Sequence, residues 1–183
     1  MNWFNTIAIL VVGYLVVFAQ AVMNEFRLAF GAQIDLLPSL VVYASLSGGV
    51  LTLTLVAICG GLWIDSLSAN PLGISLLPLF LAGLFIQRSR DLVLRQQPFA
   101  QFVLGTAASA AVPVMTLLLL LNTGAQPLVS WFSLWQWVVM SLAGGAITPV
   151  WFLVFDRITE ALNYRALGET SFRADREIKR GRQ

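Results

Sequence analysis

The chain has 183 residues, of which 58% are hydrophobic and only 11% are charged. Soluble domains carry roughly a quarter of charged residues, so the composition excludes an ordinary water-soluble fold and indicates that lipid is the solvent. The net charge of +2 is small and the bases gather in two clusters, which is typical of a membrane topology signal and argues against nucleic-acid binding.

The side chains that usually carry catalysis or metal binding are scarce. Histidine is absent and Cys59 is the single cysteine, so the commonest general base and metal ligand is missing and no intrachain disulfide can form. The sequence contains no phosphate loop, dinucleotide fingerprint, metal-ligand spacing or hydrolase elbow. We therefore expect no enzyme activity, no metal and no cofactor.

Three uncharged stretches predict membrane-spanning helices, namely Trp3–Met23, Phe99–Leu121 and Leu134–Phe155. Each has at least 21 residues, enough to cross a hydrocarbon core of about 30 Å. The first stretch could be mistaken for a signal peptide. It has no basic n-region and further spans follow it, so we interpret it as a retained helix.

Residues 35–87 are apolar but interrupted. Asp35 can cap a helix over Leu36–Leu46, which would be roughly 16 Å long and too short to cross a bilayer. We predict two helices that meet around Gly48-Gly49, which gives about six membrane segments in all. The alternative is one long, broken and tilted helix over Leu36–Ile64, which gives five.

A second interruption, rich in Ser, Asn and Pro, follows Asp65. Asn70 is a good N-cap and Pro71 suits the first helical position, so we predict a helix from Pro71 to about Gln87, roughly 25 Å long. Asp65 itself has two interpretations. It either lies at the outer interface and orders the turn, which we favour, or it is a membrane-embedded carboxylate with a functional role.

The distribution of bases predicts the orientation. The loop Gln87–Pro98 carries three arginines and one aspartate, and the last 28 residues carry seven bases, whereas Asn122–Ser133 carries no charge. The positive-inside rule places the first two in the cytoplasm and the third outside. The N-terminus is then inside with six segments and outside with five. We predict a transmembrane bundle over residues 1–157 and a cytoplasmic, charged, amphipathic tail over 158–183 that begins as a helical extension.

Small residues recur four apart on the last two spans, as the pairs Ala107/Ala111 and Ser141/Gly145. Such pairs let helices approach closely. The favoured interpretation is that they pack the chain's own bundle, and the alternative is that they bind a partner helix. Pro113 and Pro149 interrupt the same spans and are expected to kink them.

The stretch Gly60–Gly73 resembles the family of the bacterial rod shape-determining protein MreD. That family shows a glycine-containing apolar helix, then Asp-Leu-x-Ser-x-x-x-Leu-Gly, then another apolar helix. Asp35–Tyr43 looks like the family's second helix and Thr148–Arg157 like its closing helix. The chain departs from the pattern at Ser66, where the family often has Leu, and its tail past Gly168 is longer.

The resemblance implies a non-enzymatic scaffold in the bacterial inner membrane that supports lateral peptidoglycan synthesis and cell shape. The implied partners are an MreC-like bitopic protein, RodA with a class B penicillin-binding protein, MreB filaments and membrane lipid, with no nucleic acid. The implied fold is a compact all-α bundle similar to transporter S components. The candidate structural or interaction residues are Asp65, Asn70, Pro71, Gly73, Ala107, Ala111, Ser141, Gly145 and Pro149.

The alternative function is the substrate-binding S component of an energy-coupling factor vitamin transporter. Such a protein binds its ligand in an outer pocket with several convergent polar groups. The groups available for this in the outer half are Glu25, Arg27, Asp35, Asp65, Asn70, Asn122 and Gln126. A transporter subunit is expected to retain a vitamin through purification, whereas a scaffold is not. An intramembrane enzyme ranks third, because no span contains a paired acid and base.

Overall fold

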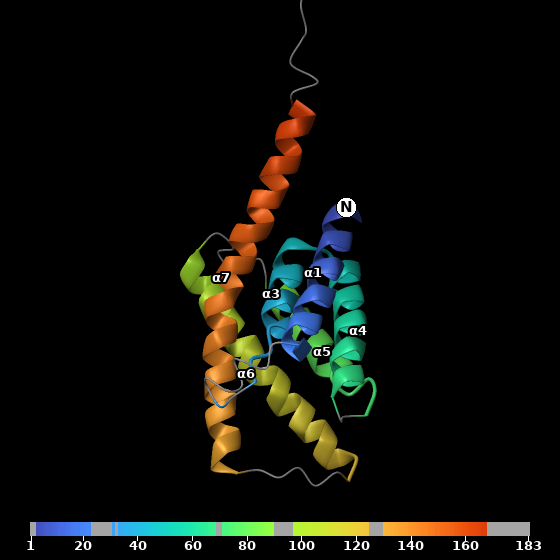
Figure 1. The fold of residues 1–183 in the computed structure, drawn as a ribbon, viewed down its shortest axis with the longest axis vertical. Helices are drawn as coiled ribbons and strands as arrows, with labels where there is room; N and C mark the ends of the chain where they lie inside the picture. Colours follow the sequence, from blue (N-terminus) through green and yellow to red (C-terminus); the bar gives the residue numbers. More distant parts are fainter. Residues whose placement is uncertain are drawn as a thin grey trace, which may run out of the picture. The chain divides into compact units, whose positions relative to one another are not determined.

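The computed structural model describes residues 3–22, 31, 33–68, 71–89, 97–124 and 130–167, with the backbone alone from 161 onward. These residues form six helices (Figure 1): α1 (Trp3–Val22), α3 (Leu37–Ser47), α4 (Val50–Leu67), α5 (Leu76–Arg88), α6 (Pro98–Asn122) and α7 (Trp131–Leu167). Helices α1, α4, α6 and α7 are long and apolar enough to cross a membrane. The described part of the chain is therefore all-helical and compatible with a membrane bundle, and the number of crossings stays a prediction.

The chain divides into two compact units, residues 1–151 and residues 152–183. The first unit contains α1, the helices from α3 to α6 and the N-terminal part of α7. In the second unit α7 continues to Leu167, so the helical extension predicted after residue 157 is confirmed. The charged residues beyond it, 168–183, lie outside the described residues.

Helix α3 is the core of the first unit. It has 11 residues, every position from Leu37 to Leu46 is buried, and it packs against α1, α4, α5 and α6. The helix begins one residue later than predicted, with Leu36 and not Asp35 at the N-cap position. The Asp35 carboxylate still accepts a hydrogen bond from the Leu37 amide at 2.9 Å, just before the first turn. The predicted break at Gly48-Gly49 is confirmed, and the alternative of a single long helix is wrong.

Two adjacent glycines in α4 allow its neighbours to approach closely. A Cβ at Gly60 would lie 2.7 Å from the Leu37 side chain, and a Cβ at Gly61 would lie 2.8 Å from Cα of Leu76. Both distances are shorter than real contacts allow, so α3 and α5 can take these positions only because α4 presents no side chain there.

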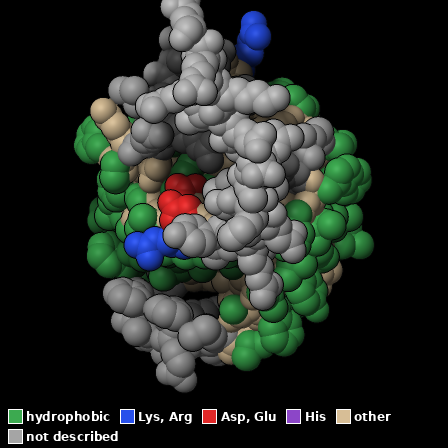
Figure 2. All heavy atoms as spheres, turned by 90° about the horizontal axis from the view of Figure 1, so that it is seen from above, with side chains coloured by type: hydrophobic (Ala, Val, Ile, Leu, Met, Phe, Trp, Pro, Cys, Tyr) green, Lys and Arg blue, Asp and Glu red, His purple; other side chains and the backbone are tan. Residues whose placement is uncertain are grey.

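Large apolar side chains remain exposed around the bundle. On α1, Trp3, Phe4 and Phe18 are each more than half exposed, and Figure 2 shows apolar side chains over most of the described surface at the sides of the view. In water such a surface would be a liability, whereas facing lipid it needs no polar cover.

Helix α5 differs from its prediction. The sequence predicts a helix from Pro71, but residues 72–75 form a turn and the helix begins at Leu76. With 13 residues it is about 20 Å long, shorter than expected. The predicted cap, Asn70, lies outside the described residues. The physical reason for the late start is the carboxylate of Asp65.

Candidate functional site

Asp65, at the end of α4, is 1% exposed and organises the turn that leads to α5. The Ser75 hydroxyl donates to its Oδ1 at 2.6 Å. The backbone amides of Gly73 and Ser75 donate to its Oδ2 at 2.8 and 3.1 Å. Three donors thus satisfy a carboxylate that would otherwise be costly to bury.

The local sequence makes this arrangement possible. Gly73 has φ of +90°, a conformation that glycine adopts without steric cost, and it turns its own amide back towards Asp65. Since the amides of residues 73 and 75 point to that carboxylate, the helix starts only afterwards. Pro71 is exposed in the turn and is not the first residue of a helix. The interpretation of Asp65 as the residue that orders the turn is confirmed, and a direct contact with a partner stays a prediction.

The second small-residue pair lies on a close seam between α6 and α7. A Cβ at Gly145 would collide with the Thr106 hydroxyl and lie 3.0 Å from the Phe102 carbonyl oxygen. Ser141 is buried, and its hydroxyl donates to the Trp137 carbonyl of its own helix at 2.7 Å. Gly145 therefore packs the chain's own bundle, the use that we favoured for both pairs.

The same seam contains two further close contacts that the sequence did not single out. A Cβ at Gly105 would collide with Thr148, and a Cβ at Gly144 would collide with Ser109. Helix α7 continues through Pro149, which is partly buried, and α6 continues through Pro113. The kinks expected at these prolines stay predictions.

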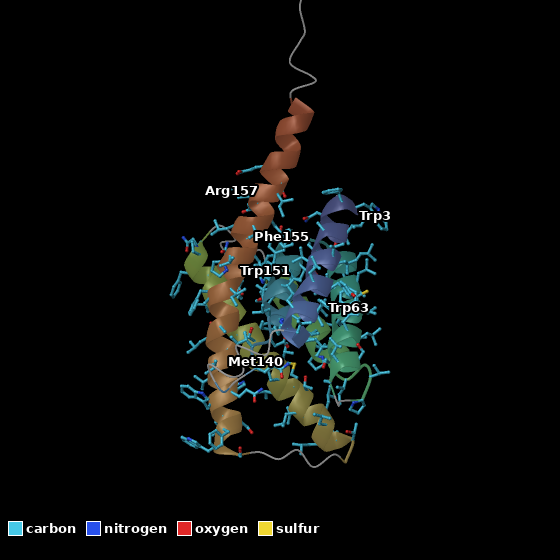
Figure 3. All side chains as sticks on the ribbon, viewed as in Figure 1. Trp3, Trp63, Met140, Trp151, Phe155 and Arg157 are labelled. Carbon is cyan, nitrogen blue, oxygen red and sulfur yellow. The ribbon has the colours of Figure 1, made fainter. Side chains whose placement is uncertain are left out.

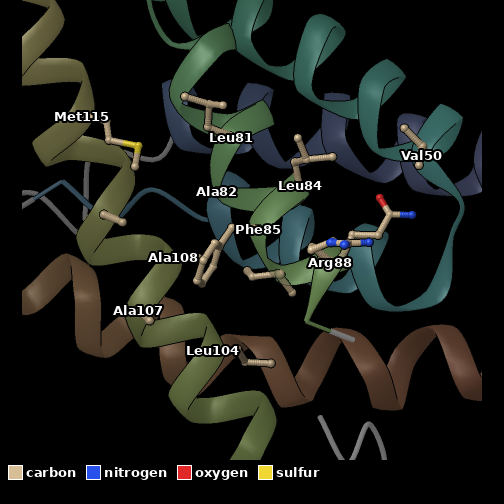
Figure 4. Close-up of a pocket in the computed structure, with 13 residues that line it drawn as sticks. Val50, Leu81, Ala82, Leu84, Phe85, Arg88, Leu104, Ala107, Ala108 and Met115 are labelled. Atoms are coloured by element: carbon tan, nitrogen blue, oxygen red, sulfur yellow. The ribbon is translucent and has the colours of Figure 1, made fainter. Parts of the chain in front are cut away.

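The first small-residue pair has a different environment. Ala107 and Ala111 line an apolar groove of about 980 Å³ between α5 and α6 (Figure 4). Its walls are Leu81–Arg88 of α5 and Leu104–Met115 of α6. Ala107 is exposed, so this pair is available to something outside the described chain.

One end of the groove is cationic. Arg88 stands in the last turn of α5 and is exposed. Among the described residues, no carboxylate pairs with its guanidinium. Further along, the ring of Phe85, 76% exposed, projects from α5 into the groove towards α6, as Figure 4 shows. Among the described residues, the groove is thus an apolar channel with one cationic side chain, Arg88, at its end.

A smaller polar cavity of about 240 Å³ lies where the ends of α1 and α4 meet the start of α7. Its polar lining consists of Gln20, Gln33, Asp35, Ser68 and Gln136. Nε2 of Gln20 is buried and has no hydrogen-bond partner within the described part of the chain. Burial raises the pKa of Asp35 to about 6, and the hydrogen bond from Leu37 opposes that shift.

The polar groups predicted for an outer ligand pocket converge only in part. Asp35 lines the cavity, whereas Asp65 is occupied by its turn and Asn122 is exposed at the end of α6. Glu25, Arg27, Asn70 and Gln126 lie outside the described residues.

Sequence reasoning missed Ser75, whose hydroxyl binds Asp65 and makes no cap hydrogen bond to α5, so a helix-cap rule does not identify its role. It also missed Gln20 and Gln136, for which no local pattern exists, because they meet only in the folded bundle.

The sequence matches no protein-family model, no curated protein and no solved structure. The residues of the chain itself therefore carry the functional proposal.

Proposed function

We propose that this chain is a non-enzymatic subunit of the bacterial inner membrane, of the MreD type, that binds an MreC-like bitopic protein. In this role it supports lateral peptidoglycan synthesis together with RodA, a class B penicillin-binding protein and MreB filaments. The observation that carries the proposal is the Asp65 turn. The resemblance rests on Gly60–Gly73. Within the described part of that range, the glycines of α4 pack closely on α3 and α5, and Asp65 holds the backbone of the turn before α5.

The Asp65 turn positions an exposed tip, which we define as Leu67 and Leu72. Asp65 is buried, whereas Leu67 and Leu72 on either side of the turn are 60% and 72% exposed. The hydrogen bonds to Gly73 and Ser75 fix the backbone next to Leu72, so this part loses little conformational freedom when a partner binds it. We therefore assign partner contact to the exposed leucines and a positioning role to Asp65.

The start of α7 offers a second contact surface at the same end of the bundle. Seven of the eight residues from Trp131 to Val138 are exposed, and Trp131 and Phe132 are 81% and 79% exposed. Aromatic side chains are enriched both at membrane interfaces and at protein interfaces. A single membrane helix of a bitopic partner fits the chemistry of this surface.

The helix directions support the six-segment topology with a cytoplasmic N-terminus. The start of α1 contacts the start of α4, where Thr6 and Thr52 share a buried hydrogen bond of 2.9 Å. The end of α1 meets the end of α4 at the polar cavity. Because α1 and α4 are parallel, the start of α1 lies at the same end of the bundle as Val50, the first residue of α4. Val50 lines the same groove as Arg88. The positive-inside rule assigns that end to the cytoplasm.

The test is affinity purification of the tagged chain from its native membrane, followed by mass spectrometry of proteins and small molecules. We expect an MreC-like protein and wall-synthesis proteins without a stoichiometric small ligand. Leu72→Gln is expected to lower partner recovery, whereas Leu121→Gln, at an exposed position at the end of α6, leaves it unchanged. Equal recovery of the partner protein with both variants would show that Leu72 is not part of the interface.

Asp65→Asn tests the positioning role in cells. We expect altered cell shape together with weaker partner recovery, because the amide group of asparagine opposes a backbone donor where the carboxylate accepts one. Asp156→Asn, at an exposed carboxylate outside the turn, serves as the control. Normal shape with Asp65→Asn would show that the turn's order does not matter for function.

The second candidate function is the S component of a vitamin transporter, and the polar cavity favours it. Gln20 contributes a buried Nε2 that finds no partner among the described residues, and Asp35 and Gln136 line the same space. A volume of about 240 Å³ is slightly below the usual range for small-molecule sites. Recovery of a vitamin and an ATPase module in the same purification, with loss of the vitamin in Gln20→Leu, would favour transport over the scaffold.

A further inference from the structure

We propose that the groove between α5 and α6 is a binding site for an anionic phospholipid, with an acyl chain along the apolar walls and the phosphate at Arg88. The site is independent of the proposed function, because a scaffold and a transporter subunit could both carry it.

The dimensions of the groove match one leaflet of a bilayer. Its wall on α6 runs from Leu104 to Met115, which is about 16 Å along a helix. Half of a hydrocarbon core is about 15 Å. The lining is apolar apart from Gln87 and Arg88 at one end, so polarity changes along the groove in the same direction as along a lipid.

The charge of the groove selects an anionic headgroup. The Arg88 guanidinium is exposed and no described carboxylate pairs with it. A guanidinium presents parallel N–H donors that match two oxygens of one phosphate. Basic pockets between membrane helices on the cytoplasmic side bind anionic headgroups in this way, and the positive-inside rule assigns the Arg88 end to that side.

A lipid fits the groove better than a partner helix. A membrane helix crosses the whole core of about 30 Å, whereas the groove covers about half of that depth. The Phe85 ring also projects into the groove (Figure 4). A flexible acyl chain passes beside such a ring, but a helix about 10 Å wide would collide with it. The small side chains of Ala107 and Ala111 then leave room for the acyl chain along α6.

The experiment is native mass spectrometry of the full chain, purified in detergent and titrated with phosphatidylglycerol or with phosphatidylcholine of the same acyl chains. Arg88→Gln is compared with Arg157→Gln, which changes an exposed arginine outside the groove. Ala107→Leu, which fills the groove, is compared with Ala146→Leu, at an exposed alanine of α7 outside it.

We expect Arg88→Gln to weaken phosphatidylglycerol binding about fivefold, the loss expected for one arginine near an anionic headgroup, and to leave phosphatidylcholine binding unchanged. Ala107→Leu is expected to weaken the binding of both lipids, and the two control variants to bind as the wild type does. Equal effects of Arg88→Gln and Arg157→Gln would overturn the proposal.

Photo-crosslinking supplies a second and independent readout. A diazirine group near the end of the phosphatidylglycerol acyl chain is expected to label peptides that contain residues 81–88 and 104–115. Labelling confined to other helices would overturn the site. A photoreactive residue at position 107 that captures another protein's membrane helix in native membranes would assign the groove to a protein and not to lipid.

Discussion

The indole Nε1 of Trp151, which is labelled on α7 in Figure 3, donates a hydrogen bond to the Ser39 hydroxyl at 2.9 Å, across 112 positions of sequence. Ser39 is fully buried and donates in turn to the Leu36 carbonyl at 2.6 Å. This two-step chain joins α7 to the first turn of α3. It gives the buried helix a polar link to a helix that is long enough to span the membrane.

The link between Ser39 and Trp151 is measurable by a double-mutant cycle. We expect Ser39→Ala, Trp151→Phe and the double variant to show a coupling free energy of about 1 kcal/mol, the usual net value of one hydrogen bond. The measurement is reversible unfolding in mixed micelles. Additive effects of the two substitutions would mean that the bond contributes nothing to stability.

Gly73→Ala tests the backbone of the Asp65 turn. We expect a loss of about 1–2 kcal/mol in the free energy of unfolding, because an L-residue is strained at a φ of +90°. Gly49→Ala is the matched control. Its φ is −93°, and at both positions an added Cβ meets nothing within 4 Å, so the pair isolates the backbone conformation. Equal stability of the two variants would contradict the strain.

Gly145→Leu tests the seam between α6 and α7. The new side chain would collide with Thr106 and the Phe102 backbone, and overpacking of this kind costs about 1–3 kcal/mol. Ala146→Leu adds the same side chain one position along, where α7 is exposed, and is expected to be neutral. Thermal unfolding in detergent distinguishes the two variants. An unchanged unfolding midpoint for Gly145→Leu would show that the close packing of α6 on α7 does not stabilise the protein.

The pH dependence of stability reports on Asp35. Burial raises its pKa from 3.8 to about 6, so the folded chain holds this proton more tightly than the unfolded chain does. The favourable contribution of the protonated carboxyl is complete below 3.8 and is lost as the pH rises through about 6. We expect wild type to lose stability relative to Asp35→Asn between about pH 4 and pH 7. The measurement is the unfolding midpoint of both proteins at several pH values. The same pH dependence for wild type and Asp35→Asn would contradict the raised pKa of Asp35.

The long helices were predictable because their signal is local. An uncharged run of apolar residues identifies both ends of α1 and α6 and the start of α7 to within a few residues, since lipid imposes a similar length on every span. The end of α7 lies beyond its uncharged run, in the predicted helical extension. The break between α3 and α4 was predictable for a similar reason, because Gly48-Gly49 weakens any helix through it. Both are properties of a short stretch of sequence.

The start of α5 was not predictable by the same reasoning. Asn70 and Pro71 satisfy the local rules for a helix start, but Asp65 lies close enough to draw the Gly73 and Ser75 amides to itself. A charged acceptor outcompetes a neutral cap when both reach the same donors. The prediction failed because the competing group came from the preceding helix.

The two small-residue pairs show where a motif stops being informative. Ala107/Ala111 and Ser141/Gly145 have the same spacing, but the first pair lines an open groove and Gly145 of the second packs on α6. The spacing says that a helix can be approached closely, and only the fold decides which neighbour approaches. The groove and the polar cavity are likewise properties of assembled helices.

The enclosure of α3 determines the order in which the chain can assemble. An 11-residue helix is too short to be retained in a bilayer by itself, and its buried hydroxyls at Ser39 and Ser45 are poorly suited to hydrocarbon. Its surroundings include α5 and α6, which leave the ribosome later. During synthesis α3 must therefore wait at the membrane interface or in the insertion machinery, and the bundle closes only when α6 arrives. A chain that ends before residue 98 would contain α1, α4 and α5 but not α6, so one side of α3 would still lack its neighbour.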